Sequence, residues 1–262
     1  SPARLGVAFS GGVDSSVLLA LAARVLGESR VLAILGISPS LAASERRAAH
    51  DVAAAIGVEV VEIATYEGDR PEYRANGADR CYFCKDELFT RIADGVAAEH
   101  GLAAVAYGEN ADDARRPDRP GAAAATDHQV LRPLADADLD KSAVRTLARA
   151  WNLPSADKPA APCLASRIPH GDEVTPQKLH QIDQAEEALR QLGFTEFRVR
   201  HHGEIARLEL PGEDLLRAVA EPLRGRVQQA VRAAGFRYAV VDLAGLQSGL
   251  FTLAAIGGSP RG

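Results

Sequence analysis

The sequence predicts an α/β protein in which a parallel sheet carries helices on both faces and a small α+β domain follows. Three observations support this prediction. Short apolar runs alternate with helically spaced segments over the first half of the chain, a glycine-rich string joins the first run to the first helical segment, and the rhythm changes after residue 171. A repeated strand–helix order is typical of parallel sheets covered on both faces. We therefore expect domains at residues 1–171 and 172–262.

Short apolar runs mark the expected strands of the first domain, at residues 5–9, 30–37, 58–63 and 103–107, with a short fifth strand at 130–131. Apolar residues at helical spacing predict helices at residues 13–26, 44–56 and 81–100. Gly57 and Gly101 stand where two of these helices should end. Residues 113–128 and 153–171 are expected to be irregular, because the first stretch is polar and rich in Pro, Gly and Ala and the second contains several prolines.

The second domain is expected to begin with a helix at Thr175 and Pro176, because proline is favoured at the first helical position. This helix should end near Gly193. A hairpin around Gly203, a helix at about 221–234 and a strand at 238–243 complete the expected α+β unit. We predict that it binds substrate or mediates oligomerisation.

Composition restricts the class of protein. Hydrophobic residues make up 47% of the chain and charged residues 25%, as in ordinary globular proteins. No apolar run is long enough to suggest a membrane span, and the first residues lack the layout of a signal peptide. The net charge of −5 gives no global basic footprint for nucleic acid. We expect a cytoplasmic homo-oligomer with neither a membrane nor a nucleic acid as partner.

A serine- and glycine-rich string follows the first expected strand and opens the first expected helix: Ser10-Gly11-Gly12-Val13-Asp14-Ser15-Ser16. Backbone N–H groups and the helix dipole attract phosphate at such a junction, and the glycines allow a close approach. The serines offer hydroxyl groups, while Asp14 could hold Mg²⁺ or orient the loop. A plain glycine-rich turn with a polar N-cap is the alternative. Transfer of the γ-phosphoryl group is not expected, since no GK[ST] string is present.

The cysteines are few and odd in number: Cys81, Cys84 and Cys163. That pattern does not suit a disulfide framework. Cys81 and Cys84 form a CxxC at an expected helix start, which favours thiolates. Three thiolates could hold a 4Fe–4S cluster with one open iron, bind structural Zn²⁺ with a histidine, or act as redox-active or buried thiols. The zinc alternative is disfavoured, because no histidine stands at finger spacing.

The serine–glycine string resembles the pyrophosphate-binding loop of the PP-loop superfamily, whose members cleave ATP between the α- and β-phosphates. Motifs along nearly the whole chain resemble one of its families, LarE. They are SGGVDSS, RCYFCK at residues 80–85, YGENADD at 107–113, RPG at 119–121, KPAAPCLASRIP at 158–169 and FRVRHHG at 197–203, with Asn76 ahead of the cysteines.

The resemblance implies a PP-loop, Rossmann-like fold and an ATP-dependent sulfurtransferase that forms AMP and pyrophosphate. LarE proteins insert sulfur into a nicotinate-derived mononucleotide during synthesis of the nickel-pincer cofactor. The implied substrate is pyridinium-3,5-biscarboxylic acid mononucleotide, with sulfide or another sulfur donor. Some members sacrifice one cysteine, which becomes dehydroalanine, and others carry three cysteines and resemble cluster-dependent thiolases. The three-cysteine pattern is present here, and Cys163 is essential under either mechanism.

Two pairs of residues are candidate substrate contacts. Arg198 and Arg200 lie two apart on an expected strand and therefore face the same side. Their guanidinium groups could fork onto a phosphate, or form ion pairs on a solvated strand face. Ser166 and Arg167 follow Cys163 closely and could hold a substrate phosphate or carboxylate. Together with Cys163 and Asp14 they are the candidate catalytic residues.

A second polar group ends the strand at 103–107, on the side where parallel sheets bind ligands. Asn110, Asp112 and Asp113 could contact nucleotide or Mg²⁺, or simply cap the loop. The roles of Asp112, Asp113 and His170 stay open. His170, His201 and His202 could serve as acid–base groups or anion contacts, but they are interpreted as surface histidines.

Three other functions compete with sulfur insertion into a mononucleotide. A PP-loop tRNA thiolase would need a basic RNA-binding face, which the acidic chain does not favour. An amidating PP-loop ligase would need an ammonia source and has no use for three cysteines. A non-catalytic nucleotide sensor with a zinc site would bind ATP without releasing pyrophosphate.

Overall fold

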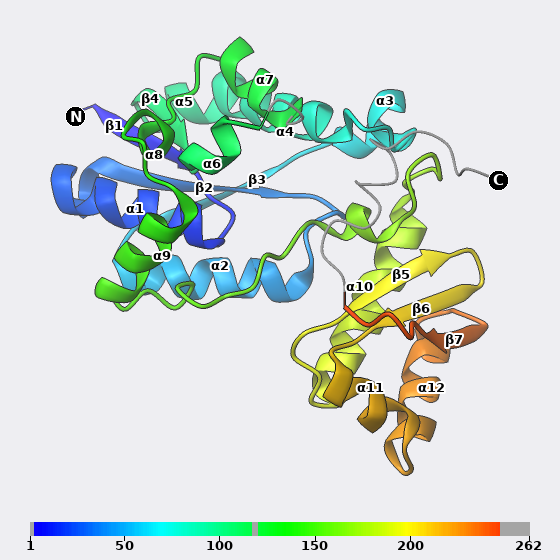
Figure 1. Cartoon of the computed structure of the whole chain (residues 1–262). Coiled ribbons are helices and arrows are strands. Elements are labelled where there is room, and N and C mark those ends of the chain that lie inside the picture. Colours follow the sequence, from blue (N-terminus) through cyan, green and yellow to red (C-terminus); the bar gives the residue numbers. More distant parts are fainter. Residues whose placement is uncertain (1–2, 117–119, 247–262) are drawn as a thin grey trace. The chain divides into compact units, whose positions relative to one another are not determined.

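In a computed structural model the chain forms two compact units, and residues 3–116 and 120–246 are described (Figure 1). The N-terminal unit consists of the described residues within 1–70 and 79–161, and the C-terminal unit of those within 71–78 and 162–246. Packing thus assigns residues 71–78 and 162–171 to the C-terminal unit, whereas the sequence placed the boundary between residues 171 and 172. Arg119, in one LarE-like motif, lies outside the described residues.

The N-terminal unit is built on a parallel sheet with strand order β3-β2-β1-β4. Its strands are β1 (Arg4–Ala8), β2 (Val31–Ile37), β3 (Val60–Ala64) and β4 (Leu102–Tyr107). The expected fifth strand is reduced to one parallel bridge between Ala106 and Leu131. Central β1 carries residues 10–16, the phosphate loop, at its carboxyl end, beside the end of β4.

Helices cover both faces of this sheet, which confirms the predicted fold class (Figure 1). On one face, α1 (Val13–Leu26), α2 (Ala43–Ile56) and α9 (Lys141–Ala150) enclose a core that includes Val7, Ala33 and Leu35. On the other face, Leu32 and Ile34 pack with residues of α4 (Arg80–Arg91) and α7 (Pro120–Asp127). Alternate residues of β2 therefore enter different cores, because successive strand side chains point to opposite faces.

Three features of this unit differ from the expected elements. The predicted helix at 81–100 is interrupted by a π-helical turn at Ile92–Val96 before α5 (Ala97–Glu99). Residues 113–128 are not all irregular, since α7 starts with a proline at its first position and continues through alanines. Helix α9 was not expected. Short helices α6 (Ala111–Ala114) and α8 (Pro133–Asp136) complete the unit.

The C-terminal unit is the expected α+β structure. Strands β5 (Arg198–His202) and β6 (Ile205–Glu209) form the antiparallel hairpin, and β7 (Tyr238–Val241) pairs with β6 in parallel. Helix α10 (Pro176–Gln191) starts as predicted, with the Thr175 side chain accepting a hydrogen bond from the Lys178 amide. Helices α11 (Gly212–Val219), α12 (Leu223–Ala233) and short α3 (Pro71–Arg74) belong to the same unit. No helix within the described residues is long and apolar enough to cross a membrane.

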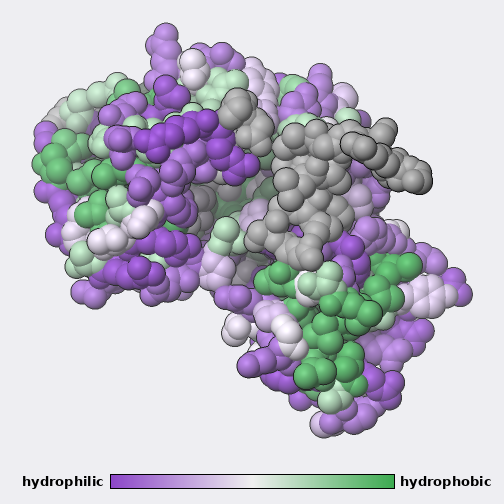
Figure 2. Space-filling model, in the orientation of Figure 1, coloured by the Kyte–Doolittle hydropathy of each residue, from purple (hydrophilic) through white to green (hydrophobic). Residues whose placement is uncertain are grey.

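Apolar side chains gather on the surface of the C-terminal unit, near α11 (Figure 2). Leu216 and Val219 of α11 are 68% and 47% exposed, and Leu243 is 89% exposed. Exposed apolar residues in one region are typical of surfaces that bind a partner.

Gly108 lets the end of β4 approach the phosphate loop. A Cβ atom at this position would stand 2.6 Å from the Ser15 nitrogen and 2.7 Å from the Asp14 carbonyl carbon. Both neighbours are backbone atoms, so they cannot turn away as a side chain could.

We expect Gly108→Ala to displace the phosphate loop and to lower the free energy of unfolding by about 1–3 kcal/mol, the usual cost of overpacking. Urea denaturation measures this change. Gly68→Ala is the matched control, because no atom of the described residues, apart from Gly68 and its chain neighbours, lies within 4 Å of the added Cβ. Equal stability of both variants would show that the close approach is not needed.

Candidate functional site

The glycine-rich loop at residues 10–16 joins β1 to α1, as the sequence predicts. Gly11 has a φ of 69°, and its Cβ position would lie 2.8 Å from the Cα atom of Ala49 on α2. A larger residue would therefore be strained and crowded there. Gly12 is the N-cap of α1 and provides no side-chain cap. The positive end of the α1 dipole and its first turn, which has no side-chain cap, therefore face the loop, and both favour binding of an anion there.

The serine hydroxyls hold the loop together. Ser15 Oγ and Ser16 Oγ donate to the Gly12 carbonyl at 3.0 Å and 2.8 Å, and Ser10 Oγ lies 3.2 Å from Ser15 Oγ. Ser15 and Ser16 are buried, whereas Ser10 is exposed. The structure therefore assigns Ser15 and Ser16 to the shape of the loop and leaves Ser10 as the hydroxyl at its surface.

Asp14 is the centre of a polar network. Its carboxylate accepts hydrogen bonds from Asn110 Nδ2 at 3.0 Å and from Lys141 Nζ at 2.5 Å. Asn110 is buried after β4, and Lys141 is the first residue of α9. An aspartate beside a phosphate site is thus neutralised by a lysine that the sequence did not identify.

The other polar candidates, Asn110, Asp112 and Asp113, form hydrogen bonds at the starts of α6 and α9. Asn110 caps α6 by accepting a hydrogen bond from the Asp113 amide at 3.0 Å, and it also donates to the Asp113 carboxylate. Asp112 accepts a hydrogen bond from the Lys141 amide at 2.9 Å. These contacts match the capping alternative and keep the carboxylates near one another. Their oxygens are the donors that Mg²⁺ prefers.

Lys158 is a second cation that sequence reasoning missed. Its Nζ atom lies 2.7 Å from Glu45 Oε2 on α2 and 3.5 Å from the Gly11 carbonyl oxygen. Arg145 of α9 donates to the carbonyls of Ala156 and Lys158, at 2.7 Å and 3.3 Å. The segment before Cys163 is therefore fastened to the phosphate loop at residue 158. Only its place within a LarE-like motif pointed to Lys158 in the sequence.

Cys81 and Cys84 occupy the first turns of α4, as predicted. Cys81 is exposed and Cys84 is half-buried. The helix is held by Asp86, whose carboxylate lies 2.7 Å from His128 Nε2 and 2.6 Å from Arg70 Nη1. The hydrogen bond to His128 is the largest cause of the lowered pKa of Asp86, and Arg70 adds to it.

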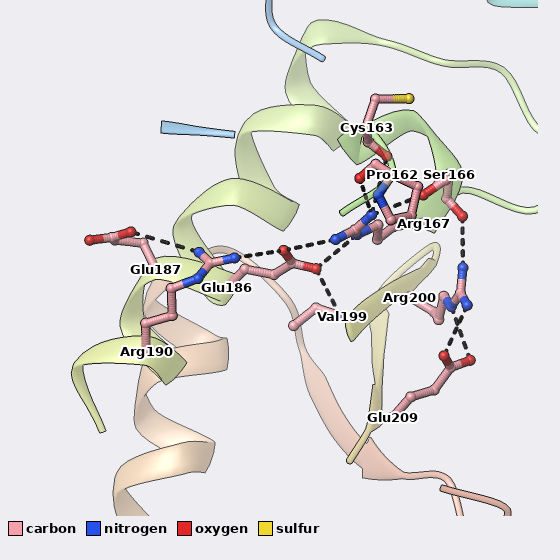
Figure 3. Close-up of polar contacts among 10 residues, drawn as sticks. All are labelled: Pro162, Cys163, Ser166, Arg167, Glu186, Glu187, Arg190, Val199, Arg200 and Glu209. Atoms are coloured by element: carbon pink, nitrogen blue, oxygen red, sulfur yellow. Dashed lines mark hydrogen bonds and ion pairs between the residues drawn. The ribbon is translucent and has the colours of Figure 1, made fainter. Parts of the chain in front are cut away.

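Cys163 lies in the C-terminal unit, at the start of a short helical turn, Leu164–Arg167 (Figure 3). Its side chain is exposed, and its carbonyl accepts a hydrogen bond from the Ser166 amide at 2.9 Å. Arg167 Nη1 donates to the Pro162 carbonyl at 2.5 Å and to the Ser166 hydroxyl at 2.9 Å. The turn therefore presents the thiol to solvent while its backbone is fixed.

Arg167 is itself anchored by a buried carboxylate. Its Nε and Nη2 atoms lie 2.9 Å and 3.3 Å from the two oxygens of Glu186, which is fully buried (Figure 3). Glu186 also accepts a hydrogen bond from the Val199 amide at 3.2 Å, at the start of β5. Arg167 thus joins the Cys163 turn to α10 and β5.

Arg200, on strand β5, also anchors the turn that carries Cys163. It makes a bidentate pair with buried Glu209, at 2.9 Å for each contact, and donates to the Ser166 carbonyl at 2.7 Å. Arg198 is also buried, and burial, followed by the charges of Arg200 and Arg167, lowers its pKa. The ion-pair alternative therefore holds for Arg200, but on a buried strand face. A phosphate contact by these arginines stays a prediction.

The cysteines have the right chemistry for a metal centre, because all three are thiols outside disulfides. They are divided between the units, with Cys81 and Cys84 in one and Cys163 in the other. Within residues 3–116 and 120–246, no group of three His, Cys, Asp or Glu side chains is gathered to hold a metal ion. The 4Fe–4S cluster therefore stays a prediction.

One histidine interpretation is wrong. His201 is buried in the C-terminal unit, where its ring packs against Phe236 and its Nε2 atom lies 3.2 Å from Gln181 Oε1. Strand alternation explains this placement, because His201 lies on the helix-covered side of β5. His170 and His202 are both partly exposed, and His170 Nδ1 lies 3.1 Å from the Asn76 carbonyl oxygen.

Comparison with known proteins agrees with this geometry. The asparagine synthase family pattern matches residues 1–81, which include the phosphate loop. Over 250 residues, the chain is 35% identical to pyridinium-3,5-bisthiocarboxylic acid mononucleotide synthase of Lactiplantibacillus plantarum, covering 94% of this chain and 88% of that protein. The chain belongs to the LarE family. An uncharacterised protein of Synechocystis sp. is 41% identical to this LarE protein, over 93% of this chain and 90% of that protein. An uncharacterised protein of Methanocaldococcus jannaschii is 26% identical, over 90% of this chain and 88% of that protein.

The Lys141–Asp14 pair generates a prediction about nucleotide affinity. We expect Lys141→Gln to weaken binding of α,β-methylene-ATP about tenfold, because it leaves an uncompensated carboxylate beside the phosphates. Calorimetry measures the dissociation constant, and Lys178→Gln on the other unit is the control. The loss should shrink in Lys141→Gln/Asp14→Asn, since the repelling charge is then absent. Additive losses in the double variant would contradict coupling between the two residues.

The Arg167–Glu186 pair generates a prediction about stability. Glu186→Ala leaves Arg167 and the Val199 amide without their buried acceptor, so we expect a loss of about 3–5 kcal/mol in the free energy of unfolding. Circular dichroism during urea denaturation measures it. Glu187→Ala is the neighbouring control, because that side chain is 32% exposed. A loss no larger than that of the control would mean that Glu186 does not hold the turn.

Proposed function

We propose that this LarE protein is an ATP-dependent sulfurtransferase that converts the carboxylates of pyridinium-3,5-biscarboxylic acid mononucleotide into thiocarboxylates. The proposal rests chiefly on similarity over nearly the whole chain to a synthase named for the bisthiocarboxylic product. The structured phosphate loop, the charge-compensated Asp14 and the exposed Cys163 support it independently.

In the first step, a substrate carboxylate oxygen attacks the α-phosphorus of ATP. A bond to that oxygen forms, the bond to the β-phosphate oxygen breaks, and pyrophosphate leaves with the electron pair. The loop amides, Ser10 and Lys141 stand where they could stabilise the charge on pyrophosphate. Mg²⁺ would be held by Asp14 together with phosphate oxygens of ATP and would neutralise phosphate charge.

In the second step, a sulfur nucleophile attacks the acyl-adenylate carbon and AMP leaves. Attachment of the carboxylate to AMP makes this displacement possible, because AMP is a far better leaving group than oxide. Cys163 is the proposed site of sulfur delivery. Arg167 and Ser166 hold its turn, and buried Arg198 is the candidate contact for the substrate phosphate.

We propose that Cys81, Cys84 and Cys163 together hold a 4Fe–4S cluster. Bound by three thiolates, such a cluster would keep one iron without a protein ligand and could accept sulfide. The presence of the CxxC supports this proposal, since sacrifice of Cys163 alone would not need it. Sulfur transfer from a sacrificed Cys163 is the second candidate.

Association of several copies is also part of the proposal. The exposed apolar residues of α11, Leu216 and Val219, support such an interface on the C-terminal unit. Sulfide or another donor would supply sulfur in the cell, and no contact with nucleic acid or membrane is needed for the chemistry.

The central experiment follows products and the protein in parallel. With ATP, Mg²⁺, sulfide and the biscarboxylic mononucleotide, the reconstituted protein should release pyrophosphate and AMP and form more than one thiocarboxylate per chain. Cys163→Ser should still release pyrophosphate but form no thiocarboxylate, because adenylation precedes sulfur delivery. Formation of ADP and orthophosphate would refute the reaction class. Loss of the mass of hydrogen sulfide from Cys163 after one turnover would favour the sacrificial mechanism.

A further inference from the structure

Arg132 and Glu109 form an ion pair within the N-terminal unit that the sequence did not identify. Arg132 Nη1 lies 3.6 Å from Glu109 Oε2, which is longer than a hydrogen bond. The Glu109 side chain is 1% exposed and the Arg132 side chain 39% exposed. Among the described residues, no donor forms a hydrogen bond with Glu109 Oε2, and no acceptor forms one with the Arg132 guanidinium. The pair therefore holds an arginine in place while its N–H groups stay available.

Glu109 lies between two residues that contact the phosphate loop. A Cβ atom on Gly108 would stand 2.6 Å from the Ser15 nitrogen, and Asn110 Nδ2 donates to the Asp14 carboxylate at 3.0 Å. The backbone on each side of Glu109 is thus fixed against the loop. Its carboxylate is therefore a firm anchor for a cation at this end of the sheet.

The stretch that carries Arg132 runs beside the end of β4. The Leu131 carbonyl accepts a hydrogen bond from the Tyr107 amide at 3.0 Å, and Leu131 forms a parallel bridge with Ala106. Neighbouring strands are about 4.8 Å apart, so Leu131 is about 10 Å from β1, across β4. Arg132 therefore stands at the carboxyl end of the sheet, where parallel sheets bind ligands.

The chemistry of the pair favours an anionic ligand. A buried carboxylate is costly unless charge pairing and hydrogen bonds compensate for it, and at 3.6 Å the hydrogen bonds are missing. A guanidinium group can give two parallel N–H bonds to the oxygens of a phosphate. A phosphate that meets Arg132 from its exposed side would take up these donors, while Glu109 fixes the guanidinium from the buried side.

We infer that Arg132 contacts the α-phosphate of ATP and that Glu109 is the positioning residue that holds it. This inference deepens the proposed adenylation and rests on it. The loop amides and Lys141 are assigned to the pyrophosphate half of ATP, so the α-phosphate is the remaining anionic group of the nucleotide. Negative charge grows on its oxygens as the substrate carboxylate attacks, and the guanidinium would stabilise that charge.

Calorimetry on the full chain with ATP, AMP, pyrophosphate and the biscarboxylic mononucleotide tests this contact. Wild type is compared with Arg132→Gln, with Arg132→Gln/Glu109→Gln and with Arg149→Gln. Arg149→Gln is the matched control, because it removes the same charge from the last turn of α9, where the side chain is 59% exposed. Urea denaturation measures the stability of each protein.

We expect Arg132→Gln to bind ATP and AMP about tenfold more weakly, as is usual for loss of a charge-assisted contact, with little change for pyrophosphate. It should also be less stable, because Glu109 is left buried and unpaired. The double variant should regain stability, since that charge is gone, but its binding of ATP and AMP should stay weak, because the donors are still missing. Arg149→Gln should match wild type.

Other results would overturn the inference in distinguishable ways. Recovery of ATP and AMP affinity together with stability in the double variant would limit Arg132 to neutralising Glu109, and so would unchanged affinity in Arg132→Gln. A loss confined to the biscarboxylic mononucleotide would assign Arg132 to the substrate instead of the nucleotide. Formation of ADP and orthophosphate by wild type would refute the proposed adenylation itself, and that result is independent of the variants.

Discussion

The contacts of the Asp14 carboxylate with Asn110 and Lys141 are the interactions on which the surroundings of the phosphate loop depend. Asp14 lies in the first turn of α1, and its partners come from the end of β4, through Asn110, and from the start of α9, through Lys141. A negative charge beside a phosphate site is costly unless it is compensated. The lysine and the amide donate hydrogen bonds to it, and they bring three separate stretches of chain together at the carboxyl end of the sheet.

In the C-terminal unit, buried carboxylates are paired with arginines. Buried Glu186 and Glu209 each meet an arginine, and through Arg167 and Arg200 they fasten the turn that presents Cys163. Buried pairs contribute little net stability, but removal of one partner is expensive. Such pairs therefore suit a role in orientation. Arginines that resemble substrate ligands in the sequence serve here first to place the thiol.

The cysteines lie next to the points where the chain passes between units. Cys81 is two residues beyond the return at 78–79, and Cys163 follows the crossing at 161–162 almost at once. Lys158 fastens the chain on one side of that crossing and Arg167 on the other. Cys163 is therefore only a few residues from a fixed point in each unit.

Local patterns in the sequence determined much of this protein. Apolar runs and glycine caps predicted the parallel sheet and helices α1, α2, α4, α10 and α12, and the string from Ser10 to Ser16 predicted the glycine-rich junction between β1 and α1, because these features depend on neighbouring residues and backbone preference. Only the tertiary structure assigned partners across long separations. Lys141 meets Asp14, Lys158 meets Glu45 and Asn76 meets Pro169, each across more than ninety residues of chain. It also turned His201 into the interior and buried Arg200 against Glu209. The physical reason is that burial and charge pairing are settled where distant segments pack, and no local spacing records which charges will meet.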